Sequence, residues 1–277
     1  MLHTLEHLAH EGAIELHLVN IDSAGQIDFD DLEKLLKTHE ASFVSLMHGN
    51  NEIGNITDLA RVGELCHEHH AYFHSDMVQT LGHVGVDLNS LKIQAISGSA
   101  HKFHGPKGVG LMYINADKPL PPLLIGGGQE RNMRGGTENV AGIVGLAKAL
   151  EIAYANHDVH QAGLISLKKH AMELLAKSIH GIRFNGLSGD MNRSLHKILS
   201  IALPSVEDND MLLFNLDIAG ICVSGGSACA SGTSIGSHVI DALGLEENTG
   251  IIRLSFSKYN TEAEITAFVE ILKKSLS

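Results

Sequence analysis

The chain alternates short apolar runs with longer segments in which apolar residues recur every three or four positions. Runs such as 42–47 and 71–76 have the length of buried strands, whereas 27–39 has the period of a helix that buries one face. Asp28 stands where it can cap that helix. Strands that alternate with helices are typical of an α/β domain with a mainly parallel sheet. In this first part the pattern predicts strands at 14–19, 42–47, 71–76, 93–99 and 108–114, and helices at 3–11, 27–39 and 58–70.

The pattern changes after a long helix that the apolar spacing predicts over residues 140–157. A second helix over 164–180 follows it, and short strands then alternate with helices. This favours a smaller C-terminal α+β domain packed on the first and joined to it by the long helix. We therefore expect a large domain over 1–150 and a small domain over 151–277. The strands of the small domain are expected in "GIRFNG", "KILSIALP", "GICVSGG" and "IIRLSF", and its helices at 207–219, 236–243 and 261–275.

Composition and charge narrow the class of protein. The 277 residues include 44% hydrophobic and 19% charged residues, which suits a globular protein with a large core. The net charge of −12 argues against nucleic acid and against anionic membrane surfaces, because both attract basic patches. No apolar run reaches the roughly 18 residues that cross a bilayer, and the opening "MLHTLEHLAHEG" lacks the basic start and apolar core of a signal peptide. We therefore expect a cytoplasmic protein with no membrane or nucleic-acid partner.

The three cysteines direct attention to one position. Cys66, Cys222 and Cys229 are far apart and odd in number, so neither a disulfide framework nor a structural metal site is expected. Cys222 lies in the apolar strand predicted in "GICVS", whereas Cys229 lies among glycine, serine and alanine in "SGGSACASGTS". Such a segment leaves the backbone much freedom, so its thiol could move toward and away from a reaction centre. The other interpretation of Cys229 is a small buried cysteine in a tight turn.

Polar side chains follow three of the predicted strands at the points where the strands end. Ligands of open α/β sheets bind at the carboxyl ends of the strands, so we expect these side chains to meet at one edge of the sheet. Pyridoxal phosphate needs such a set: a lysine for a Schiff base, a carboxylate at the pyridinium nitrogen, and amide and hydroxyl donors for the ring oxygen and phosphate. Each residue taken alone has an ordinary structural interpretation, such as a helix cap. The residues are Asn50 and Asn51, Asp76 and Gln79, and Ser99, His101 and Lys102.

Five segments in order along the chain resemble the consecutive motifs of the cysteine desulfurases of the NifS and IscS type, which are enzymes of the class V aminotransferase family. The resemblance covers almost the whole chain with consistent spacing. It implies a fold-type I transferase that depends on pyridoxal 5'-phosphate, with L-cysteine as substrate. It also implies a homodimer, and a sulfur acceptor or an iron–sulfur scaffold protein as partner. The segments are "MHGNNEIGN", "HSDMVQTLG", "SGSAHKFHGPKGVG", "GGGQERNMRGGT" and "GGSACASGTSIGSHVIDALG".

The resemblance also implies roles for single residues. Lys102 would bond to the cofactor and act as the base. Cys229 would accept the sulfur as a persulfide while alanine leaves. Cys229 could also be a transient iron–sulfur ligand. Arg253 would bind the substrate carboxylate through two parallel contacts, unless it is a surface arginine on a strand. Asn51 would lie beside the substrate and the ring. The remaining implied contacts are Asp76 at the pyridinium nitrogen, Gln79 at the ring oxygen, Ser99 and His101 at the phosphate, and Thr137 at the phosphate in the partner subunit; His101 and His104 are candidate proton carriers.

One departure from the family lies at the start of the chain. Family members carry a further segment before the position that matches Met1, and it includes a loop at a helix N-terminus that takes the cofactor phosphate. We therefore expect the 277-residue chain to bind the cofactor weakly and to expose sheet edge. Two other functions stay open: a selenocysteine lyase or aminotransferase of the same family, and a non-catalytic remnant that dimerises or binds a scaffold partner. An aminotransferase has no need of Cys229 on a flexible segment.

Overall fold

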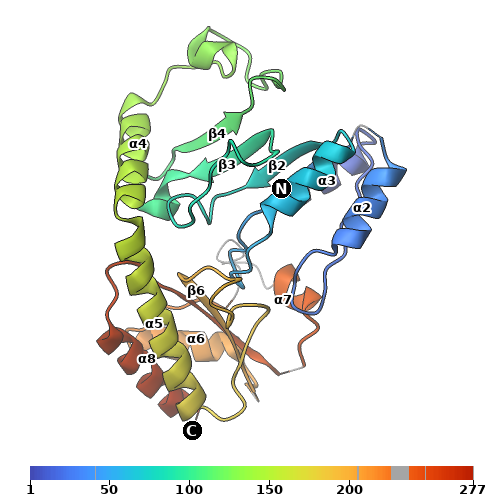
Figure 1. Cartoon of the computed structure of the whole chain (residues 1–277). Coiled ribbons are helices and arrows are strands. Elements are labelled where there is room, and N and C mark those ends of the chain that lie inside the picture. Colours follow the sequence, from blue (N-terminus) through green and yellow to red (C-terminus); the bar gives the residue numbers. More distant parts are fainter. Residues whose placement is uncertain (41, 205, 226–236, 247, 277) are drawn as a thin grey trace.

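The computed structural model describes residues 1–40, 42–204, 206–225, 237–246 and 248–276, and the structural statements below concern these residues. They form a four-stranded sheet in the order β1-β2-β3-β4 and a three-stranded sheet in the order β5-β6-β7. Figure 1 shows the first sheet in one half of the molecule and the second in the other half. The first half contains α1 (Leu2–His10), α2 (Phe29–Thr38), β1 (Phe43–Met47), α3 (Leu59–Glu68), β2 (Tyr72–Asp76), β3 (Ala95–Ser99), the 3-10 turn η1 (Ala100–Phe103) and β4 (Gly110–Ile114).

The first sheet is mainly parallel, as the alternation of strands and helices predicts. Strands β1, β2 and β3 run parallel, and β4 returns antiparallel to β3. Helix α2 begins at Asp28, whose side chain accepts from two backbone N–H groups, so the predicted cap is confirmed. Leu32 and Leu36 of α2 and Val62 of α3 belong to the same buried cluster as Phe73 of β2, which joins these helices to the sheet.

The second sheet is antiparallel and surrounded by three long helices. Its central strand β6 is buried at all six positions because it pairs on both sides and packs against helices. Helix α8 begins with a reciprocal capping box between Thr261 and Glu264, which satisfies two backbone N–H groups at the helix start. The elements of this half are α5 (His157–Ser178), β5 (Arg183–Phe184), β6 (Ile198–Leu203), α6 (Asn209–Ile218), α7 (His238–Ala242), β7 (Gly250–Ser255) and α8 (Glu262–Ser275).

A helical column connects the two halves along one side of the molecule. Helix α4 (Val140–Ala155) is followed directly by α5, with Asn156 between them, and Figure 1 shows the two helices running in succession past both sheets. One buried cluster extends from Leu32 to Ala153 and the other from Leu164 to Leu272. The domain boundary near residue 150 stays a prediction. Between β4 and α4 lies the short 3-10 turn η2 (Gln129–Asn132).

Two predicted strands are absent from the described residues. Residues 14–19 have no regular structure, and Leu18 is 65% exposed, because no neighbouring strand pairs with them there. Residues 220–225 form only an isolated bridge between Ser224 and Arg253. Cys222, expected in a buried strand, is therefore exposed. Among the described helices, none combines the length and the apolar character needed to cross a membrane.

Candidate functional site

The carboxyl ends of the three parallel strands lie side by side. In the sheet register Asp76 is opposite Met47 of β1 and opposite Ser97 of β3. The pairing continues just past the strands, where the His48 N–H donates to the Asp76 carbonyl and the Met77 N–H donates to the Ser97 carbonyl, both at 2.9 Å. The loops that carry the predicted site residues therefore leave the sheet next to one another.

Lys102 lies in the tight turn that follows β3. The lysine is half-buried, and its carbonyl accepts from His83 Nε2 at 2.8 Å. Gly105 closes the turn through an N–H bond to the Ala100 carbonyl at 2.9 Å. A Cβ at Gly105 would come within 2.9 Å of that same carbonyl oxygen, so a larger residue does not fit there. The small residues around Lys102 thus serve to close the backbone on itself and hold the lysine at the strand end.

Asp76 and Gln79 occupy the turn after β2. Asp76 Oδ1 accepts from the Val78 N–H at 2.9 Å, and Gln79 is 9% exposed. Thr80 Oγ1 is hydrogen-bonded to His48 Nδ1 at 2.9 Å, which ties this turn to the end of β1. Burial lowers the pKa of His48 to about 4, so this imidazole is neutral at neutral pH.

Ser99 and His101 form a pair beside Lys102, whereas Thr137 lies apart. Ser99 Oγ and His101 Nδ1 are hydrogen-bonded at 2.8 Å, and His101 is exposed. Thr137 is also exposed, in the segment that leads from β4 to α4, and Figure 1 shows this segment extending outward beyond the sheet. No described contact joins Thr137 to the strand ends of its own chain.

Arg253 and Asn51, both predicted at the substrate, meet across the two halves of the molecule. Arg253 Nη1 donates to the Asn51 carbonyl at 2.9 Å, so the contact involves the main chain of Asn51. Arg253 is half-buried in β7, and its role at the substrate stays a prediction. Asn50, which precedes Asn51 in the chain, accepts hydrogen bonds from the N–H groups of Glu52 and Ile53 through its Oδ1. Asn50 is therefore a turn residue.

Cys229 lies outside the described residues, but the described residues on either side of its segment are held near this contact. Ahead of the segment, Ser224 pairs with Arg253, whose N–H donates to the Ser224 carbonyl at 2.6 Å. After it, Ser237 Oγ donates to the carboxylate of Glu52, which is 2% exposed. The described residues Ser224 and Ser237 are therefore both connected to the loop of Asn51 and Glu52, Ser237 directly and Ser224 through Arg253.

The other two cysteines have different surroundings. Cys66 is buried in the first cluster, and burial raises the pKa of its thiol to about 12. Cys222 is exposed. A thiol with so high a pKa is a poor nucleophile, so the structure gives Cys66 a packing role.

Lys197, which no sequence pattern indicates as a site residue, is 8% exposed just before β6. Burial and, after it, the positive charge of Lys102 lower the pKa of Lys197 to about 7. In the sequence, Lys197 directly precedes the apolar run "ILSIAL". A charged residue at such a border is easily interpreted as the end of a strand. A further cluster that the sequence did not indicate brings ligand atoms of Glu15, His17 and His39 within 4.8 Å of one another near the surface.

Known proteins resemble the chain over nearly its whole length. Residues 1–268 match the family described as Aminotransferase class-V. The chain is 41% identical over 276 residues to a protein of Clostridium botulinum (strain Hall) named cysteine desulfurase IscS, and the match spans 99% of this chain and 68% of that protein. It is 38% identical over 268 residues to the putative cysteine desulfurase IscS 1 of Bacillus subtilis (strain 168), of which it covers 69%.

Solved structures give the same answer for the fold. A structure titled NifS-like protein superposes with a TM-score of 0.87 at 35% identity, covering 99% of this chain and 71% of that one. The NifS-like protein from Rickettsia africae gives a TM-score of 0.88 at 28% identity and covers 73% of that chain. The α/β architecture with a mostly parallel sheet is the one that the resemblance implies, and the chain belongs to the aminotransferase class-V family.

Proposed function

We propose that this protein is a cysteine desulfurase that uses pyridoxal phosphate, removes sulfur from L-cysteine, releases L-alanine and takes the sulfur onto Cys229. The observation that carries this proposal is the match to a protein named cysteine desulfurase at 41% identity across 99% of the chain. The contact between Arg253 and Asn51, beside the two ends of the Cys229 segment, supports it independently.

The chemistry of the residues at the strand ends fits the cofactor. Lys102 would hold it through its amine, Asp76 would lie at the pyridinium nitrogen, and Gln79 would lie at the ring oxygen. Ser99 and His101, already paired with each other, would bind the phosphate. When bound, pyridoxal phosphate supplies an electron sink that lets a proton leave the α-carbon of an amino acid.

The residues of the chain perform the remaining steps. Arg253, fixed by the carbonyl of Asn51, would orient the carboxylate of L-cysteine, which a planar guanidinium binds well. Lys102 would move the proton at the α-carbon, and His101 or His104 would carry protons nearby. The thiolate of Cys229 would attack the substrate sulfur, so that an S–S bond forms and the C–S bond breaks. The balance is one L-cysteine and one thiol giving one L-alanine and one persulfide.

Two substitutions test the proposal in separate steps. Lys102→Ala should abolish the cofactor adduct that borohydride fixes, whereas Lys107→Ala, at an exposed position in the same turn region, should keep it. Cys229→Ser should keep the adduct and lose persulfide formation, because serine cannot hold sulfur, and Cys222→Ser should keep both. Mass spectrometry of the reduced protein measures the cofactor adduct. Alanine released from L-cysteine and persulfide formed on the protein measure the sulfur transfer. Activity that depends on Cys222 and not on Cys229 would contradict the assignment.

The same measurements separate the alternatives. An aminotransferase would consume amino acid without forming a persulfide, a selenocysteine lyase would prefer the selenium substrate, and a non-catalytic protein would do neither. A second copy of the chain, with Thr137 at the phosphate of its partner, belongs to the proposal, as do a cytoplasmic location and a protein that accepts the sulfur. Analytical ultracentrifugation of the purified chain tests the dimer.

A further inference from the structure

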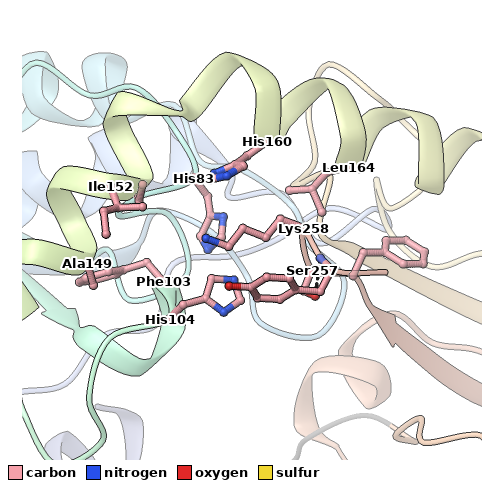
Figure 2. Close-up of a pocket in the computed structure, with 13 residues that line it drawn as sticks. His83, Phe103, His104, Ala149, Ile152, His160, Leu164, Ser257 and Lys258 are labelled. Carbon is pink, nitrogen blue, oxygen red and sulfur yellow. Dashed lines mark hydrogen bonds between the residues drawn. The ribbon is translucent and has the colours of Figure 1, made fainter. Parts of the chain in front are cut away.

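A cavity of about 170 Å³ lies directly behind the turn that carries Lys102. Its walls come from that turn, from α4 and α5, and from the segment that follows β7. Figure 2 shows Lys258 extending across the cavity toward His83. The rings of His104 and Tyr259 meet edge to face with centroids 5.5 Å apart. None of these groups takes part in the proposed desulfurase reaction except His104.

Lys258 is the only charged side chain in the described lining of the cavity, because the histidines beside it are largely neutral at neutral pH. Lys258 and three histidines, His83, His104 and His160, line it, and no carboxylate does so in the described part of the chain. Burial lowers the pKa of all three histidines, to about 3 for His83. The charges that add to this effect are all positive and come from Lys197, Lys258 and neighbouring histidines, His157 among them. Such an environment lacks a counter-charge.

The cavity also has apolar walls. Phe103, Ile152, Leu164 and Phe256 contribute hydrocarbon to its walls. A volume of about 170 Å³ is nearly six times the roughly 30 Å³ that one molecule occupies in liquid water, so the cavity suits a molecule of a few heavy atoms. A fully hydrated oxyanion would make no favourable contact with the apolar walls. A carboxylate with a short chain can contact Lys258 through its charge and the apolar walls through its chain.

We propose that this cavity binds a short-chain carboxylate, with the carboxylate at Lys258 and the histidines and the chain against Phe103 and Leu164. The anion supplies the negative charge that the cavity lacks. Its attraction to Lys258 is stronger in the cavity than in bulk water. The site is coupled to the catalytic turn, because Phe103 and His104 follow Lys102 directly and His83 holds the Lys102 carbonyl. This binding does not depend on the proposed desulfurase activity.

Calorimetric titration of the purified chain with acetate, propionate and butyrate tests the proposal, and inorganic phosphate is the comparison. We expect saturable binding that is tighter for propionate than for acetate, and weaker binding of phosphate. Lys258→Met removes a charge-assisted contact and should weaken propionate about tenfold or more, whereas Lys107→Met should leave the affinity unchanged. Phosphate binding alone, or equal propionate affinity in the wild type and Lys258→Met, would overturn the proposal.

A second measurement covers the possibility that Lys258→Met changes the fold. In the unmodified chain, saturating propionate should raise the pKa of His104 and His160, as followed by NMR, because a nearby carboxylate stabilises the imidazolium form. His3, which is exposed and far along the sequence from the cavity, serves as the internal control, and its NMR signals should not respond to propionate. Histidine signals that do not move with propionate would contradict the site even if calorimetry reports heat.

Discussion

Two lysines are buried in the second half of the molecule, and their surroundings differ. Lys168 Nζ donates to Ser194 Oγ at 2.8 Å and to the Leu195 carbonyl at 2.9 Å. Lys197 Nζ donates to no acceptor among the described residues, although it is 8% exposed. Burial lowers both pKa values, to about 8 for Lys168 and to about 7 for Lys197. One lysine is thus part of the packing, and the other is a charge placed beside Lys102.

Replacing each lysine by methionine should separate these two roles. Lys168→Met leaves two buried acceptors with one donor fewer and should lower the free energy of unfolding by about 2–4 kcal/mol. Lys197→Met removes a buried charge that has no described hydrogen bond, and it should leave the free energy of unfolding unchanged or higher. Urea denaturation at pH 7 measures both. The reverse order of stabilities would show that Lys197 is held by contacts and Lys168 is not.

At this scale the sequence predicts only part of the candidate site. Asp76 and Lys102 can be predicted to be neighbours because the ends of parallel strands meet at one edge. The bond between Arg253 and Asn51 joins residues 202 positions apart, and no local pattern reports it. The burial of Lys197 cannot be predicted from the sequence either, because it results from how the second half of the molecule packs on the Lys102 turn.

Secondary-structure elements were predictable where their own residues determine them. Helix α2 begins at its capping Asp28 and α8 at Thr261, and both follow from short sequence signals. The strand predicted at 14–19 did not form, because a strand needs a hydrogen-bonded neighbour that its own sequence does not supply. Helix α5 begins at His157, seven residues before the predicted 164, because polar residues there are tolerated on an exposed first turn.

Two glycines should respond in opposite ways to alanine. Gly163 lies inside α5, where a Cβ would meet nothing within 4 Å, so Gly163→Ala should raise the free energy of unfolding by about 0.5–1 kcal/mol. Gly105→Ala would place its Cβ 2.9 Å from the Ala100 carbonyl oxygen, and should lower that free energy by about 1–3 kcal/mol. Thermal unfolding followed by circular dichroism compares them. A Gly105→Ala protein as stable as Gly163→Ala would mean that the Lys102 turn is not closed as described.

For the whole molecule, the two halves are joined by several specific hydrogen bonds, two of which lie at the candidate site. The His83 carbonyl accepts from Gln161 Nε2 of α5 at 2.6 Å, and Arg253 reaches the Asn51 carbonyl. These contacts lie around the Lys102 turn and the Asn51 loop. The candidate site is therefore also the place where the two halves hold each other, so stability and site geometry are expected to change together.

Acid should destabilise the whole molecule through two histidines. Burial lowers the pKa of His48 to about 4 and of His83 to about 3, against about 6.5 in an unfolded chain. Below pH 6.5 the unfolded chain therefore binds protons that the folded chain does not, and the free energy of unfolding falls as the pH falls. The expected loss between pH 7 and pH 5 is about 2 kcal/mol for each histidine.

Urea denaturation at the two pH values measures this loss, and His48→Gln should remove the part of it, about 2 kcal/mol, that His48 contributes. His10, an exposed histidine in α1, provides the matched control, and His10→Gln should leave the pH dependence unchanged. A pH dependence that His48→Gln does not alter would show that the folded chain already accommodates a charged His48.

The anchoring of Ser224 on Arg253 and of Ser237 on Glu52 has a kinetic consequence for the proposed reaction. Cys229 is joined to these two residues by only a few positions of sequence on each side, so the effective concentration of its thiol at the substrate is set by the chain and not by the amount of protein. Sulfur capture would then be a first-order event within one chain, and diluting the enzyme would leave its rate per molecule unchanged. Delivery to an acceptor would remain second-order, and the acceptor concentration would decide how long the persulfide persists.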